Sequence, residues 1–200
     1  FSEKDIRILT ISGLLHDIGK IMIPNEILTK PGKLTVAEYN IMKQHVNFGY
    51  EKVKNQNIDI RIKEACLLHH EKCDGTGYPF GLKSDHIPAV AKIIAIADVY
   101  DAMTSARVYR GALCPFEVID TMYKDAFTKF EPEYILPFLK NVASSYINND
   151  VRLSDGRIGK VVLINENALS LPIVQCEDEF IDLSKTCLLY TSPSPRDRQK

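Results

Sequence analysis

Three features that would narrow the function of a chain at once are missing from this sequence: a strong charge of one sign, a long apolar run and a disulfide pattern. The 200 residues carry a formal net charge of −1 at pH 7, so the chain as a whole attracts neither a nucleic-acid polymer nor an anionic membrane. No apolar run approaches the roughly 18 residues of a membrane span. We therefore expect any phosphate-bearing ligand to be recognised by local groups.

The cysteines are odd in number and include no CxxC pair; they are Cys66, Cys73, Cys114, Cys176 and Cys187. Such usage is typical of reduced thiols in a cytoplasmic protein rather than of a disulfide framework. Cys73 lies inside a glycine-bearing motif, and a role for its thiol as a metal ligand stays open as the weaker alternative.

The chain does contain enough apolar material for a core. Hydrophobic residues make up 45% of it and its mean hydropathy is −0.12, values typical of a globular domain. We predict a mostly α-helical domain over residues 1–147 and a small β-strand appendage over residues 148–186. Residues 187–200 switch to a Pro/Ser/Arg composition without periodicity, which indicates a disordered or non-native tail.

Capping residues mark the first predicted helices. Ser2 can cap a helix that ends near the first histidine. Thr35 and Glu38 form a capping box that predicts a helix continuing to Phe48. A further helix is predicted over residues 59–70, from its apolar stripe.

Prolines mark the later helices. Pro88 precedes a long predicted helix on which Asp98 and Asp101 share one face. Pro115 and Pro132 stand where first-turn prolines begin helices.

Around Asn148 the pattern changes to that of short strands. The pair Asp155-Gly156 predicts a hairpin turn. Alternating and β-branched residues predict three strands, over residues 161–164, 171–176 and 179–183.

Four of the five histidines stand in polar motifs. His69 and His70 open the stretch HHEKCDGTGYP, whose glycines and proline suit the wall of a metal site better than a structural turn. His16 and Asp17 open HDIGK, and His45 follows the letters MKQ. A chance scatter of histidines would not sort in this way, so the motifs predict a metal centre.

Six side chains supply the predicted ligands: His16, Asp17, His45, His69, His70 and Asp98. This mixed nitrogen and oxygen set, without thiolates, suits iron or manganese, while zinc or nickel compete by raw affinity. We expect two divalent transition metals, or three. Two metals roughly 3.5–4 Å apart can activate a water for in-line attack on phosphorus and stabilise the departing oxygen.

Simpler interpretations exist for single residues. A lone His45 on a helix is more often a satisfied core histidine, and Asp98 among apolar neighbours could cap or pair. A buried carboxylate without a cation is costly, however, and this favours the metal centre for the set as a whole.

In their order and spacing, HDIGK, HHEKCDGTGYP and ADVYDAMTSARVYR resemble the HD-GYP family, a branch of the HD metal-dependent phosphohydrolases. The resemblance runs from about Phe1 to Tyr146. It implies an HD-type helical bundle and an enzyme that hydrolyses cyclic di-GMP, a bacterial second messenger, to pGpG or GMP.

The resemblance also implies roles around the metals. Asp17 would bridge two metals and serve catalysis, and Lys20 would reach a phosphate oxygen or help to protonate the leaving group. Arg107 and Arg110 would bind the substrate phosphates with bidentate guanidinium groups. Tyr78 would present an aromatic wall to the substrate.

Five neighbours of these residues are predicted to support the site without binding metal. Glu71 and Asp74 would organise the loop that follows the paired histidines. Gly75 and Gly77 would allow a positive φ or a close backbone approach. Asp101 is expected to support the site, because Asp98 matches the ligand position of the family.

The family has a further ligand-bearing helix ahead of the HD motif, and the segment before His16 is too short to include it. We expect truncation to explain this and the full-length protein to continue upstream into a receiver or sensory domain. Association as a homodimer stays open.

Two rival functions remain at this stage. In the first, the chain hydrolyses another cyclic dinucleotide or a nucleotide phosphate by the same metal-dependent chemistry. The other is a catalytically silent module that binds cyclic di-GMP or a signalling partner. The GYP loop argues against the first, and the intact ligand set argues against the second.

Overall fold

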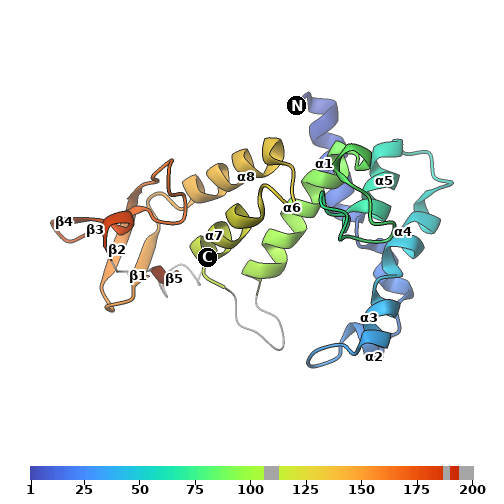
Figure 1. The fold of residues 1–200 in the computed structure, drawn as a ribbon, viewed down its shortest axis with the longest axis horizontal. Coiled ribbons are helices and arrows are strands. Elements are labelled where there is room, and N and C mark those ends of the chain that lie inside the picture. Colours follow the sequence, from blue (N-terminus) through green and yellow to red (C-terminus); the bar gives the residue numbers. More distant parts are fainter. Residues whose placement is uncertain (106–112, 187–189, 194–200) are drawn as a thin grey trace.

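The computed structural model describes residues 1–105, 113–186 and 190–193 of the chain. In this part, helices lead from the N-terminus to residue 145 and a small antiparallel sheet follows them (Figure 1). The predicted class, mostly α-helical with a small C-terminal β region, is confirmed. None of the described helices combines the length and the apolar character that crossing a membrane requires.

The first helices begin where the sequence predicted caps. Helix α1 (Glu3–Leu15) follows Ser2, and α3 (Val36–Met42) follows Thr35. Each hydroxyl accepts a backbone N–H of the first turn, and an acidic side chain in that turn completes a capping box.

Prolines open the long helices, as predicted. Pro88 caps α6 (Ala89–Thr104), and α7 (Pro115–Asp125) and α8 (Pro132–Ser145) each start with a proline. The other helical elements are η1 (Ile18–Met22), α2 (Asn25–Leu28), α4 (His45–Val53), α5 (Ile60–Leu68) and η2 (Ser84–His86).

The single helix predicted from Thr35 to Phe48 is wrong, because the structure has two. The N–H of Gln44 bonds the carbonyl of Ile41, three residues earlier, and this tightens the turn at the end of α3. Helix α4 then starts afresh and packs on η1, so His45 stands at a helix start rather than in a helix interior.

The sheet has strands in the order β4-β3-β2-β1-β5, all paired antiparallel. Gly156, at φ +91°, lies in the predicted turn between β1 and β2. Residues 190–193 pair with β1, where the sequence predicted no regular element. The strands are β1 (Asp150–Leu153), β2 (Ile158–Leu163), β3 (Ile173–Cys176), β4 (Glu179–Asp182) and β5 (Tyr190–Pro193), with the short η3 (Leu183–Lys185) after β4.

The largest group of buried apolar side chains, named here the C-terminal core, joins α6, α7, α8 and the sheet. It runs from Ile96 to Leu183, and helix and strand residues share it, so the sheet packs as part of the helical body. The helices around α1 and α5 bury two smaller apolar clusters, one including Ile62 and the other Leu68.

Candidate metal centre

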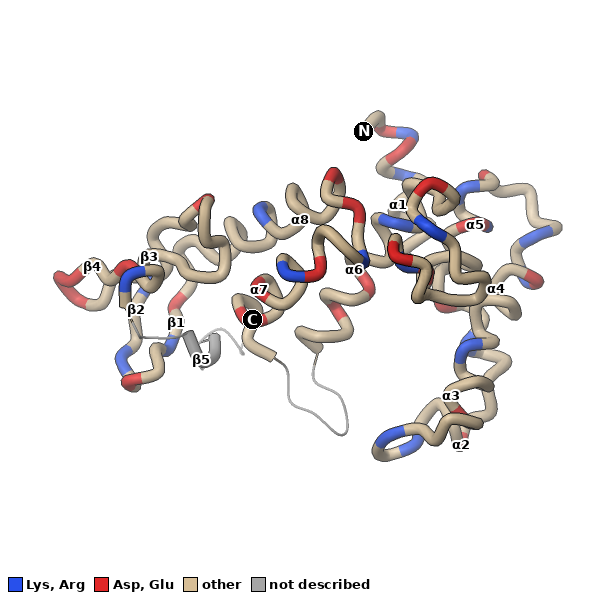
Figure 2. The backbone as a smooth tube through the Cα atoms, viewed as in Figure 1, with Lys and Arg blue, Asp and Glu red and all other residues tan. Residues whose placement is uncertain are grey.

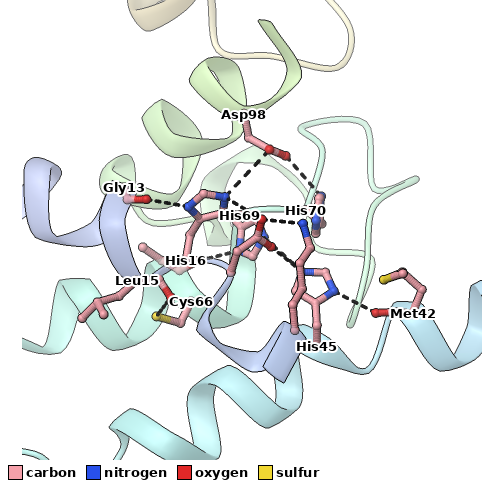
Figure 3. Close-up of polar contacts among 12 residues, drawn as sticks. Gly13, Leu15, His16, Met42, His45, Cys66, His69, His70 and Asp98 are labelled. Carbon is pink, nitrogen blue, oxygen red and sulfur yellow. Dashed lines mark hydrogen bonds and ion pairs between the residues drawn. The ribbon is translucent and has the colours of Figure 1, made fainter. Parts of the chain in front are cut away.

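All six predicted metal ligands lie together between η1, α4, α5 and α6. Ligand atoms of four of them lie within 4.8 Å of one another, and so do those of a second group of three. The first group is Asp17, His45, His69 and His70; the second is His16, Asp17 and Asp98. Figure 3 shows the four imidazoles gathered beside Asp98 of α6. Because Asp17 belongs to both groups, it stands between two candidate ion positions.

Backbone carbonyl groups orient three of the imidazoles (Figure 3). The Nδ1 atoms of His16, His45 and His69 lie 2.8, 2.8 and 2.9 Å from carbonyl oxygens three or four residues earlier. A carbonyl only accepts, so each Nδ1 donates. In the neutral rings of His45 and His69 each Nε2 then carries the free lone pair, whereas Nε2 of His16 lies 3.2 Å from Oδ2 of Asp17. These Nε2 atoms face the centre of the cluster, which is the arrangement typical of metal-binding histidines.

Burial keeps most of these imidazoles neutral. It lowers the pKa of His69 to about 3 and that of His70 to about 2, and neighbouring imidazoles add to both shifts. Burial also lowers the pKa of His45. At His16 burial acts in the same direction, but the hydrogen bond and charge of Asp17 outweigh it and raise the pKa. Neutral imidazole is the form that binds metal.

One carboxylate oxygen of Asp17 is left without a hydrogen bond from the described part of the chain. Burial would raise the pKa of its carboxyl group, but hydrogen bonds from His16 and Lys20 outweigh it and hold that pKa well below its usual range. Its Oδ1 atom is buried without a hydrogen-bond partner among the described residues. That atom lies 3.3 Å from Nε2 of His45, whose lone pair faces it.

The two imidazole nitrogens nearest Asp17 also have lone pairs without a donor among the described residues. Nε2 of His45 and Nε2 of His69 lie 3.4 Å apart. Because both Nδ1 atoms already hold the ring protons, these two lone pairs face one another. Converging lone pairs and an ionised, unpartnered oxygen are unfavourable alone and fit a divalent cation. Cys73 belongs to neither ligand group.

A glycine in the HDIGK motif brings η1 against α4. A Cβ atom built on Gly19 would lie 1.9 Å from the carbonyl oxygen of His45 and 2.4 Å from the backbone nitrogen of Gly49. No other residue fits that contact. Gly19 therefore lets Asp17, two residues earlier, lie beside His45.

Glu71 anchors the loop that follows the paired histidines. It is buried, and its carboxylate accepts the backbone N–H groups of Phe80 at 2.7 Å and Leu82 at 2.9 Å. Asp74 accepts the N–H and hydroxyl of Thr76. These bonds agree with the loop-organising roles predicted for both carboxylates.

The glycines of this loop place Tyr78 over the metal centre. Gly75 adopts φ +84°, and a Cβ on Gly77 would lie 2.4 Å from Cα of Glu71. The tyrosine ring stacks on that of His70 with centroids 4.7 Å apart and planes 26° apart.

The two carboxylates of α6 differ in position. Asp98 lies 3.8 Å from Nε2 of His16 and 3.9 Å from Nδ1 of His70. Asp101 is exposed and accepts the hydroxyl of Ser105 at the end of the helix. Only Asp98 therefore belongs to the cluster.

A cavity of about 940 Å³ opens beside the centre, within the range of roughly 300–1,000 Å³ usual for ligand pockets. His45, His70 and Asp98 line it, together with Lys20 and Tyr78, both predicted to contact substrate. Arg107 and Arg110 lie outside the described residues.

Sequence reasoning missed two residues beside this cavity. Tyr39 lines it, and the ammonium group of Lys43 lies over the rings of Tyr39 and Tyr78. Both residues precede His45 in the segment that was predicted as one continuous helix. Their spacing of four was a signal that they share a helix face, but nothing in the sequence placed that face at the cavity.

Comparisons with known proteins agree with this geometry. Residues 1–134 match the HD domain family. A cyclic di-GMP phosphodiesterase of Pseudomonas aeruginosa is 38% identical over 171 residues, which cover 85% of this chain and 41% of the relative. A 3′3′-cGAMP-specific phosphodiesterase of Vibrio cholerae is 44% identical over 117 residues, 57% of this chain and 26% of the relative. The chain thus spans less than half of either.

The fold also matches a solved structure. An HDG"Y"P protein from Bdellovibrio bacteriovorus superposes with a TM-score of 0.55 at 22% identity, over 68% of this chain and 43% of that one. At this identity the match concerns the fold alone.

Proposed function

Because the chain belongs to the HD domain family and has the motifs of its HD-GYP branch, we propose that it is a metal-dependent phosphodiesterase that hydrolyses cyclic di-GMP. The products are pGpG or GMP, and the setting is bacterial second-messenger signalling in the cytoplasm. The observation that carries the proposal is the convergence of four imidazoles and two carboxylates beside a cavity of ligand size.

The ligand set supports at least two ions with Asp17 shared between them. The nitrogen and oxygen donors, without a thiolate, favour iron or manganese. Bound metals would supply Lewis-acid chemistry, activating water and stabilising the departing ribose oxygen.

The residues of the chain supply orientation and charge. The carbonyl-bonded imidazoles hold their Nε2 atoms inward, and Glu71 fixes the loop that carries Tyr78. Lys20 lines the cavity with its ammonium group at Asp17, close to where a phosphodiester would meet the metals. We assign Lys20 to a phosphate oxygen or the leaving oxygen, and Arg107 and Arg110 to the phosphates.

A second candidate substrate keeps the same chemistry. The similarity to a 3′3′-cGAMP-specific phosphodiesterase makes a mixed guanine–adenine cyclic dinucleotide the rival. Catalytic silence is disfavoured because all six predicted ligands in this chain converge.

The test combines metal analysis with a product assay. Protein loaded anaerobically with Fe²⁺ or Mn²⁺ should retain at least two ions per chain and convert cyclic di-GMP to linear products separated by chromatography. Asp98→Ala should lower both the metal content and the rate of cyclic di-GMP hydrolysis. Asp101→Ala, on the same helix but exposed, should change neither quantity. Loaded protein that cleaves a small artificial phosphodiester but no cyclic dinucleotide would leave only the metal phosphohydrolase.

A further inference from the structure

Lys43, in the turn between α3 and α4, lies between two tyrosines that line the cavity. Its Nζ atom is 5.3 Å from the ring centroid of Tyr39 and 5.9 Å from that of Tyr78. Among the described residues no carboxylate pairs with it. An ammonium group that no carboxylate neutralises can still donate hydrogen bonds to a ligand.

The two tyrosines offer different surfaces. Tyr78 stacks on His70, so one face of its ring is covered. Tyr39 is 48% exposed and lines the cavity from α3. Burial raises the pKa of the Tyr78 phenol and Tyr39 adds to the shift, in keeping with neighbouring phenol groups. An exposed ring beside a cavity suits stacking of a nucleobase.

Lys43 contacts the rings of Tyr39 and Tyr78 and is not itself part of the cavity lining, but two lysines of that lining are unpaired within the described part of the chain. Lys33 comes from the loop between α2 and α3, whose basic residues Figure 2 shows, and Lys72 comes from the loop after the paired histidines. Lys30, in contrast, is held by both carboxylate oxygens of Glu38, at 2.8 and 2.7 Å. Asp98 is the one carboxylate on the described cavity lining. The wall thus has free positive charge in a chain of net charge −1.

We infer that Tyr39, Lys43, Tyr78, Lys33 and Lys72 form a subsite for the nucleotide of the cyclic dinucleotide that is not cleaved, and that Lys43 selects guanine there. The inference rests on the proposed function. The purine stacks on Tyr39, and the second phosphate binds the ammonium groups of Lys33 and Lys72.

Lys43 distinguishes guanine from adenine by the hydrogen-bonding groups on one edge of each base. Guanine presents two acceptors, O6 and N7, on one edge, whereas adenine presents an amino donor beside N7. An ammonium group only donates, so it matches guanine at both atoms and adenine at one. Lys43 is therefore a specificity-determining residue, and Tyr39 binds either base.

The experiment measures binding to metal-free protein, which keeps the ligand intact. Cyclic di-GMP and cyclic di-AMP are titrated calorimetrically into the wild type, Lys43→Ala, Lys43→Arg and Tyr39→Ala. Lys43→Ala should weaken cyclic di-GMP roughly fivefold to a hundredfold and leave cyclic di-AMP nearly unchanged. Lys43→Arg should restore the preference, and Tyr39→Ala should weaken both ligands roughly fivefold to a hundredfold.

Matched controls lie on α7, away from the cavity. Tyr123 is 46% exposed, close to the value for Tyr39, and Lys124 pairs with Asp120. Tyr123→Ala and Lys124→Ala should bind both nucleotides as the wild type does. The double variant Lys33→Ala/Lys72→Ala should lose affinity for the two ligands by the same factor. That loss should become smaller with added salt.

The outcomes separate this subsite from the proposed function. If the wild type binds and cleaves cyclic di-GMP and Lys43→Ala and Tyr39→Ala bind both nucleotides normally, the subsite is wrong and the function stands. If the metal-loaded wild type cleaves a small artificial phosphodiester but neither cyclic dinucleotide, the substrate is wrong and the subsite falls with it.

Discussion

The N-terminal and C-terminal parts of this molecule bury different kinds of side chain. All buried polar or charged residues of the described chain lie among its first 71 residues; they are Ser12, His45, His69 and Glu71. The C-terminal core, in contrast, is built from apolar side chains of α6, α7, α8 and the sheet. Burial of apolar surface drives folding, whereas burial of polar groups opposes it unless they are satisfied.

The difference assigns separate tasks to the two parts. The histidine-rich part holds converging lone pairs and a carboxylate oxygen without a hydrogen bond from the described residues, an arrangement that a bound cation would stabilise. The C-terminal core needs no ligand to be favourable. We expect the core to stabilise the fold and the metal centre to depend on its ions for part of its own stability.

The largest effect should come from the C-terminal core. Phe116 is 2% exposed, and Phe116→Ala removes a full aromatic side chain from that core. The free energy of unfolding should fall by about 3–5 kcal/mol in urea titrations. Phe127→Ala is the control, because Phe127 is 66% exposed. Equal losses for the two variants would contradict the assignment of stability to this core.

Gly19→Ala should instead weaken metal binding. The added Cβ would meet the backbone of His45 and Gly49, which cannot move aside as a side chain can. We expect a loss of about 1–3 kcal/mol in stability and roughly tenfold to a hundredfold in metal affinity, since Asp17 shifts from His45.

Gly13→Ala is the matched control for that variant. The nearest atom to a Cβ there is Cδ1 of Ile94 at 3.9 Å, an ordinary contact. Alanine within α1 should be neutral or stabilising by up to about 1 kcal/mol. Normal metal affinity in Gly19→Ala, measured by competition with a chelating dye, would show that η1 need not lie so close to α4.

Mild acid should act on the histidine-rich part first. The pKa values of His69 and His70 are lowered to about 3 and about 2, so both stay neutral in the fold and take up protons on unfolding below their ordinary value of 6.5. Stability is thus present above pH 6.5 and lost as pH falls toward 3. From pH 7 to 6 the metal-free protein should lose about 1 kcal/mol, with His16, whose pKa is raised, acting in the opposite direction.

Hydrogen exchange in chelator would locate that loss. Amides of α4 and α5 should lose protection before those of α7 and α8. His70→Gln should reduce the pH dependence of the free energy of unfolding. Uniform loss of protection would mean that the two parts unfold together.

The same comparison shows which features of the fold and of the site could be predicted from the sequence. The helix starts at Ser2 and Thr35 and the convergence of the six residues predicted as ligands were predictable, because motifs and caps depend on residues close in sequence. The break between α3 and α4 was not, because packing of α4 on η1 through Gly19 produces it. Tyr39 and Lys43 were missed for the same reason. β-Branched and alternating residues predicted the strands from Val161 onward, but neither strand β1 nor the core that α7 and α8 share with the sheet.

The smallest effect should come from the end of the sheet. Strand β5 is an edge strand of four residues that pairs with β1 alone, and its register shifts at Arg152 and Leu153. Each backbone hydrogen bond contributes about 0.5–1.5 kcal/mol net, while ordering each residue costs about 1–2 kcal/mol of conformational entropy. These contributions nearly cancel, so truncation after Thr186 should change the free energy of unfolding by less than about 1 kcal/mol. Metal content should stay the same, because the centre lies on η1, α4, α5 and α6. A loss as large as that of Phe116→Ala would instead make residues 187–200 part of what stabilises the C-terminal core.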